Sequence, residues 1–147
     1  MTHEDKGKYA AKHASGTALN EKIAEAVREK TSDGRIACGT CENISKDLGV
    51  EIREVGLTAD LLERKITTCQ LGLFGYAGKA NHGKDIQVAD SVTEEMKSTL
   101  REATENGKVA CASVWAIADQ AGAKRKEVSS ACETLKLKIG PCQLGAF

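Results

Sequence analysis

Aromatic side chains are scarce in this sequence, at 3% of its residues. The core must therefore be built mainly from Ile, Leu, Val and Ala, which is typical of small helical units. Proline occurs once, at Pro141. Lys plus Arg and Asp plus Glu number 21 each, so net charge alone does not direct the chain to nucleic acid or to an anionic surface.

Long apolar runs are also missing. None approaches the roughly 20 residues of a membrane-spanning helix, and residues 1–18 lack the apolar centre of a secretory signal. We therefore expect a cytoplasmic protein with no membrane partner. In that compartment its six cysteines are expected to be thiols, metal ligands or small buried apolar groups rather than disulfides.

The usual catalytic patterns are not found. The chain has three histidines, His3, His13 and His82, and each falls outside the expected core. No glycine-rich loop links a strand to a helix, and no pair of carboxylates or Ser–His–Asp set stands out. We expect a protein that is not an enzyme and that needs no cofactor, apart from the metal alternative considered below.

What the sequence does contain is a duplication. Shifted by 73 residues, residues 34–74 align with 107–147 without a gap, and 15 of 41 positions are identical. Weaker similarity upstream extends the two units to 19–74 and 92–147. Residues 1–18 are expected to form a mobile tail and residues 75–91 a linker. The repeat closes on Cys-Gln-Leu-Gly, and Phe74 or Phe147 is expected to fold back over the core of its own unit.

Each unit predicts three helices and two short strands. The helices are expected over about 21–32, 41–48 and 52–64, and over about 94–105, 114–121 and 125–136. Polar residues suited to N-caps precede the first and second helices: Asn20, Thr40, Thr93 and Ser113. Short apolar runs before the second helix and after the third predict the strands, and Pro141 fits only an edge or a strand end.

A glycine-containing turn joins the second and third helices of each unit, as in a helix-turn-helix. Apolar or small residues flank it in both copies: Ile44, Leu48, Val50 and Val55 around Gly49, and Ile117, Ala118, Ala121, Ala123 and Val128 around Gly122. This spacing resembles the helix-turn-helix superfamily, although Ser45 replaces the usual small apolar residue. With a preceding helix and short strands, each unit is similar to a winged-helix domain, although a full wing is not evident.

The resemblance implies a mainly α fold with short β-strands, in two tandem winged-helix-like domains. It also implies a small DNA-binding, transcription-regulator-like protein that uses double-stranded DNA as a partner. The same fold also serves in protein-interaction modules, so a non-DNA adaptor is the alternative. A cysteine-based metal or redox sensor is a third possibility, which is compatible with either.

The third helices of the two units differ in chemistry. A helix-turn-helix presents the early residues of this helix to DNA, where phosphates need cations and base edges need donors. Unit 2 offers such groups at positions expected to face outward: Lys124, Arg125, Lys126, Ser129, Ser130 and Glu133. Unit 1 offers acids and apolar groups instead: Glu51, Ile52, Arg53, Gly56, Leu57 and Asp60. We therefore expect unit 2 to contact DNA, although the basic triplet could also be a solvated helix end.

Formal charge agrees with this difference. Residues 19–74 carry 8 Lys/Arg and 10 Asp/Glu, which gives −2, and residues 92–147 carry 8 and 7, which gives +1. We expect a protein partner or a second copy of the chain to bind unit 1, with Ile52 and Leu57 at the interface.

Trp115 aligns with Glu42 and is expected near the surface, as a partly covered local contact or as part of an interface.

Two cysteine positions are common to both units: Cys38 with Cys69, and Cys111 with Cys142. Cys41 aligns with Val114 and Cys132 with Ala59, which indicates that those positions tolerate plain apolar residues. If the flanking strands pair, each shared pair lies close together beside a helix N-terminus, which favours a thiolate. Buried structural thiols, a zinc or iron–sulfur site and a reversible thiol switch all remain open. A metal site would need more ligands, from Cys41, Cys132, His82 or a second pair.

Overall fold

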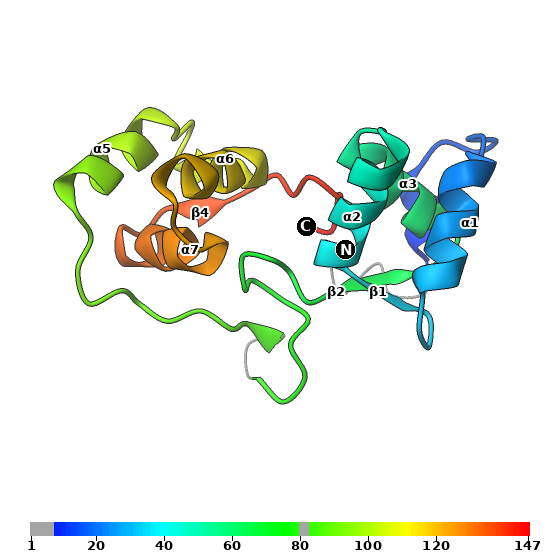
Figure 1. Cartoon of the computed structure of the whole chain (residues 1–147), viewed down its shortest axis with the longest axis horizontal. Helices are drawn as coiled ribbons and strands as arrows, with labels where there is room; N and C mark the ends of the chain where they lie inside the picture. The colour runs from blue at the N-terminus through cyan, green and yellow to red at the C-terminus, as the bar shows by residue number, and fades with distance from the viewer. Residues whose placement is uncertain (1–7, 80–82) are drawn as a thin grey trace. The chain divides into compact units, whose positions relative to one another are not determined.

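The computed structural model describes residues 8–79 and 83–147, and these are mainly helical with a few short strands (Figure 1). The chain forms two compact units. Unit 1 contains residues 1–69 together with 143–147, and unit 2 contains residues 70–142. Within the described ranges, no helix has the length and apolar character needed to cross a membrane.

Unit 1 begins with a short 3₁₀ helix, η2 (Tyr9–Lys12), and continues through helices and strands in the order α, β, α, α, β. These are α1 (Glu21–Lys30), β1 (Arg35–Ala37), α2 (Cys38–Leu48), α3 (Ile52–Leu61) and β2 (Lys65–Thr67). Its core is aliphatic, as expected, and includes Ile23, Val27, Ile36, Ile44, Val55 and Ile66, each at most 2% exposed.

Unit 2 repeats the same order of elements (Figure 1). These are α5 (Glu94–Glu102), β3 (Lys108–Val109), α6 (Cys111–Ala121), α7 (Arg125–Thr134) and β4 (Lys138–Ile139). Its core is also aliphatic, with Leu71, Leu100, Val109, Val114 and Val128 at most 1% exposed.

The N-caps of the first helices are confirmed and those of the second helices are wrong. The Asn20 side chain accepts from the backbone N–H groups of Lys22 and Ile23, and the Thr93 side chain accepts from Met96. The second helices begin earlier than expected, at Cys38 and Cys111, and have no side-chain cap. The strand before each helix leads directly into it, so Thr40 and Ser113 lie inside the first turn.

The strands of each unit pair as expected, and both pairs are parallel. Ile36 lies opposite Ile66, and Val109 lies opposite Ile139. The parallel direction follows from the chain path, since two helices cross over between the paired strands. Among the described residues no third strand joins either pair, so no wing is present there and the winged-helix resemblance remains a prediction.

The turn between the second and third helices requires a left-handed residue in both units. Gly49 ends α2 with φ 65°, and Gly122 ends α6 with φ 64°. Glycine adopts this conformation without the steric cost of a Cβ atom. A glycine-containing turn therefore joins the second and third helices in both units, as the sequence predicts, and the helix-turn-helix resemblance remains a prediction.

The closing segments, residues 70–74 and 143–147, do not follow the expected boundaries. Residues 143–147 belong to compact unit 1, and residues 70–74 belong to unit 2. Leu71, Leu144 and Ala146 are buried, whereas Phe147 is 39% exposed. The expectation that Phe147 folds back to cover the core of its own unit is therefore wrong, and the aliphatic residues of these segments are the ones that pack.

The expected mobile tail is partly structured. Tyr9 is 3% exposed, and the Glu63 carboxylate accepts from the backbone N–H groups of Tyr9 and Ala10 at 2.9 and 2.8 Å. Asp60 on α3 is 1% exposed and lies 3.1 Å from Lys12 Nζ and 2.8 Å from His13 Nε2. Residues 9–13 therefore pack along α3.

Candidate nucleic-acid interface

The predicted DNA contacts lie at the start of α7, directly after the turn at Gly122. The backbone N–H of Ala123 donates to Ala118, and that of Lys124 donates to the Glu127 carboxylate at 3.2 Å. These bonds fix the angle at which α7 leaves the turn. They place Lys124, whose side chain is exposed, immediately before the first residue of the helix.

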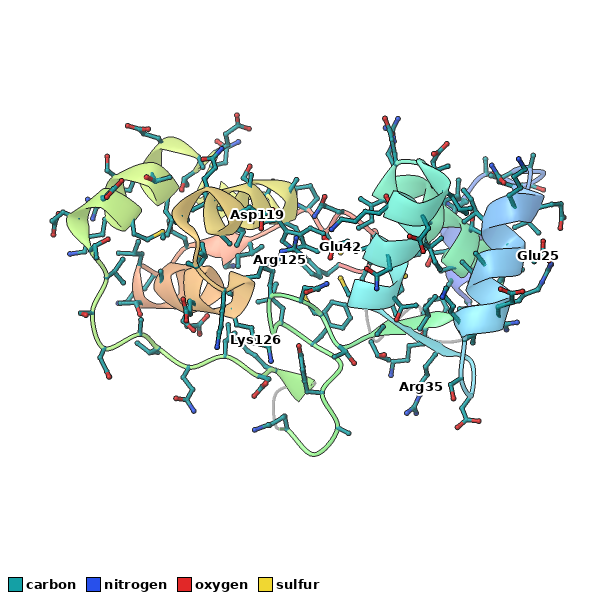
Figure 2. The ribbon with its side chains drawn as sticks, in the orientation of Figure 1. Glu25, Arg35, Glu42, Asp119, Arg125 and Lys126 are labelled. Carbon is teal, nitrogen blue, oxygen red and sulfur yellow. The ribbon has the colours of Figure 1, made fainter. Side chains whose placement is uncertain are left out.

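Arg125 is held by the preceding helix. Its guanidinium carbon lies 3.8 Å from the centroid of the Trp115 ring, and its Nη2 lies 3.8 Å from an Asp119 carboxylate oxygen (Figure 2). Both partners belong to α6. A guanidinium stacked on an indole keeps its charge while it loses rotational freedom. Arg125 is therefore a fixed cation at the turn, with 17% of its side chain exposed.

Lys126 faces the segment that precedes α5. Its Nζ donates to Asp85 at 2.8 Å and lies 4.3 Å from the centroid of the Tyr76 ring. The hydrogen bond from Lys126 lowers the pKa of Asp85, and the same bond raises the pKa of Lys126. Lys126 therefore stays charged, and Asp85 neutralises part of its field.

The two serines are not exposed as expected. Ser129 is 0% exposed, so the prediction that it faces outward is wrong. Ser130 is half-buried and donates to the Lys126 carbonyl oxygen at 2.9 Å. Ser129 follows the core residue Val128 and is buried with it, and the segment before α5 packs along the rest of α7. Lys84 pairs with Glu133 at 3.1 Å, and the Ala89 N–H donates to Thr134 at 2.8 Å.

The corresponding face of α3 in unit 1 is covered in the same way. Gly56 and Asp60, both expected to face outward, are buried, whereas Glu51 and Arg53 are exposed. Ile52 and Leu57, the proposed protein contacts, are half-buried. Only the first turn of α3 is available to a partner, and its exposed residues carry acidic as well as basic charge.

The two covering segments occupy equivalent places in the units, since residues 10–18 and 83–91 are 73 residues apart, although no residue is identical between them. Both segments precede the first helix of a unit and contact its third helix. Tyr9, an aromatic residue in an otherwise polar stretch, was a sequence signal of packing for the first segment.

Trp115 is 8% exposed and is in contact with Arg125. The local contact, one of the two alternatives for this residue, is therefore present in unit 2. An interface role for Trp115 remains a prediction.

In unit 2 the two shared cysteines lie on neighbouring stretches of backbone, whereas the closeness of Cys38 and Cys69 in unit 1 remains a prediction. Cys38 and Cys111 are the first residues of α2 and α6, and the Cys111 N–H donates to Pro141 at 3.1 Å, directly before Cys142. All six cysteines are reduced thiols. Cys132 is 1% exposed, and burial raises the pKa of its thiol to about 11, so it is a neutral buried group.

Among the described residues, no group of three or more Cys, His, Asp and Glu side chains is placed to hold a metal ion. His82, a conceivable fourth ligand, lies outside the described residues. A metal role for Cys38, Cys69, Cys111 and Cys142 therefore remains a prediction, because a closed site needs more than the two shared cysteines of one unit.

Comparisons with protein-family models, with curated proteins and with solved structures gave no match. The helix-turn-helix resemblance accordingly depends on the sequence pattern and on the geometry of the two turns.

Proposed function

We propose that unit 2 binds double-stranded DNA through the turn and the first residues of α7. The observation that carries this proposal is the position of Lys124, Arg125 and Lys126 at the start of the helix that follows the glycine turn, an arrangement that resembles a helix-turn-helix. In DNA-binding proteins of this kind, these positions approach the major groove and its flanking phosphates. The role that follows is that of a small DNA-associated regulator.

The contacts are mainly to phosphate. Reading bases from this helix requires donors farther along it, and there Ser129 is buried and Ser130 is bonded to the helix backbone. Lys124 and Arg125 are the two cations of the triplet that lie outside the Asp85 ion pair. A complex based on such contacts depends steeply on salt and discriminates little between sequences.

Unit 1 has a different role. The start of α3 carries Glu51 and Glu54, which would repel phosphate. The rest of its outward face is covered by residues 9–13 and by the second closing segment. We therefore propose that unit 1 contacts protein rather than DNA.

The test compares two triple variants of the full chain on a random duplex over a range of salt concentrations. In the first, Lys124, Arg125 and Lys126 are replaced by Ala. In the control, three exposed cations of α1, Lys22, Arg28 and Lys30, are replaced by Ala. The first variant should bind more weakly, and its slope of log affinity against log salt should fall by about 0.9 for each phosphate that it no longer neutralises. The control should bind as the wild type does.

Two results would overturn the proposal. One is a wild-type chain that shows no salt-sensitive binding to duplex DNA. The other is an equal loss of affinity in both triple variants, which would assign the binding to overall charge rather than to the start of α7.

A further inference from the structure

The second closing segment, residues 143–147, binds at a defined site in unit 1, formed by Gly56 of α3 and Lys12 and called the seat below. A Cβ atom added at Gly56 of α3 would lie 2.3 Å from the Leu144 carbonyl oxygen and 2.8 Å from its Cα and carbonyl carbon. Lys12 Nζ donates to the Gly145 carbonyl oxygen at 3.0 Å. Leu144 is 3% exposed and Ala146 is 0% exposed. The segment is therefore held by backbone contact, a hydrogen bond and two buried side chains.

The first closing segment, residues 70–74, is held in unit 2 at the equivalent carbonyl. The Asp85 N–H donates to the Gly72 carbonyl oxygen at 2.7 Å, and Leu71 is 0% exposed. Asp85 aligns with Lys12, and Gly72 aligns with Gly145, at the same shift of 73 residues. In both units, therefore, the residue at this aligned position, Lys12 or Asp85, donates a hydrogen bond to the glycine carbonyl oxygen of the repeated Leu-Gly sequence.

In each unit the segment in this seat is the one that completes the repeat of the other unit. Residues 143–147 end the repeat that begins near residue 92, yet they belong to the compact unit that contains residues 1–69. The seat therefore recognises the Leu-Gly segment itself and does not require that the segment follow directly on the unit that holds it. This is the arrangement of a domain swap, made here between the two halves of one chain.

We propose that the seat beside Gly56 also accepts residues 143–147 from a second copy of the chain, so that two copies associate by exchange of this segment. The interactions in the seat are the same whichever chain supplies the segment. The attached segment has only the advantage of a high effective concentration, on the order of 1 mM for a short flexible link. Association between copies consequently increases with protein concentration. This surface is separate from the start of α7, and the inference stands or fails independently of DNA binding.

The direct test uses a full-length acceptor whose own segment cannot dock. Leu144→Asp places a charge at a buried position, which expels residues 143–147 from the seat. A fluorescent peptide with the sequence of residues 143–147 is then titrated to about 1 mM, and its anisotropy is followed. We expect saturable binding. The Leu144→Asp, Gly56→Ala double variant should weaken it by at least about tenfold, because the added Cβ occupies the position of the peptide backbone.

A peptide with Asp in place of the leucine is the matched control and should not bind. A peptide that fails to saturate a folded Leu144→Asp chain, or that binds it equally well with Gly56→Ala, would overturn the proposal. Folding of each variant is checked by far-ultraviolet circular dichroism.

A second measurement needs no acceptor variant. Sedimentation of the wild-type chain over increasing concentration should show a growing dimer fraction, and Gly56→Ala should abolish it. A wild-type chain that stays monomeric up to about 1 mM would contradict the exchange, because that concentration equals the advantage of the attached segment.

Discussion

The effect of Gly56→Ala on the free energy of unfolding should depend on whether residues 143–147 are bound beside Gly56. We expect the substitution to destabilise the chain when the segment is bound and to stabilise it when the segment is absent. Gly56 lies within α3, where Ala is the better helix former by about 1 kcal/mol. In the native chain, however, the new Cβ would lie 2.3 Å from the Leu144 carbonyl oxygen. That oxygen belongs to the backbone and cannot rotate away as a side chain can.

The magnitude follows from two terms. Overpacking a closed site costs about 1–3 kcal/mol. If the segment leaves the seat instead, Leu144 is no longer buried, which costs about 2 kcal/mol, and the hydrogen bond from Lys12 is broken as well. After the helix-propensity gain is subtracted, we expect Gly56→Ala to lower the free energy of unfolding of the wild-type chain by about 1–2 kcal/mol.

In a Leu144→Asp background the seat is already vacated, and only the helix-propensity term remains. Gly56→Ala should then raise the free energy of unfolding by up to about 1 kcal/mol. The four variants form a double-mutant cycle with a coupling energy of about 2–3 kcal/mol. Urea denaturation followed by circular dichroism measures it, and Asn43→Ala, at an exposed position of α2, is the control. Asn43→Ala should have the same small effect in both backgrounds.

A change in the free energy of unfolding that has the same sign for Gly56→Ala in both backgrounds would refute this reasoning. It would mean that the packing of Leu144 against α3 does not contribute to the stability of unit 1.

Three further predictions follow from the ion pair, the buried thiol and the packed N-terminal segment. Asp85→Asn should free Lys126 for phosphate, raise affinity for duplex DNA and steepen the salt slope by up to about 0.9 in a filter-binding titration; unchanged binding would show that Lys126 does not contribute. The raised pKa of Cys132, about 11 against 9.0, stabilises the fold fully below pH 9, and this stability is lost as pH rises towards 11. Urea titrations should therefore show the wild-type chain losing about 2–3 kcal/mol more than Cys132→Ala between pH 8 and pH 11, and parallel curves would contradict the burial of this thiol. Glu63→Ala removes the acceptor of the Tyr9 and Ala10 N–H groups and should speed tryptic cleavage after Lys12 at least severalfold, whereas Glu29→Ala on α1, at an exposed residue, should not.

The helices and strands were largely predictable because their signals are local. Asn20 and Thr93 cap through side chains that reach only two or three residues along the chain, and Gly49 and Gly122 adopt a conformation that few other residues tolerate. The starts of α2 and α6 were missed because no capping side chain marks them. Their position is fixed instead by strands whose partners lie about 30 residues away.

The candidate site was predictable in composition but not in exposure. The basic triplet and the turn that precedes it can be identified in the sequence. The pairing of Lys126 with Asp85 depends on a residue 41 positions earlier in the chain, and the periodicity of a helix does not reveal such a contact. The burial of Ser129 likewise depends on tertiary packing.

The sequence by itself determined the duplication, the order of elements in each unit, the helix-turn-helix spacing and the aliphatic core. These depend on local conformation and on which residues can be buried. Only the tertiary structure decided which unit holds each closing segment and which faces of α3 and α7 are covered. The two closing segments are nearly identical in sequence, so their residues do not indicate which unit holds each of them. In unit 1 the absent side chain of Gly56 leaves room for the backbone of Leu144, a fit that appears only in three dimensions.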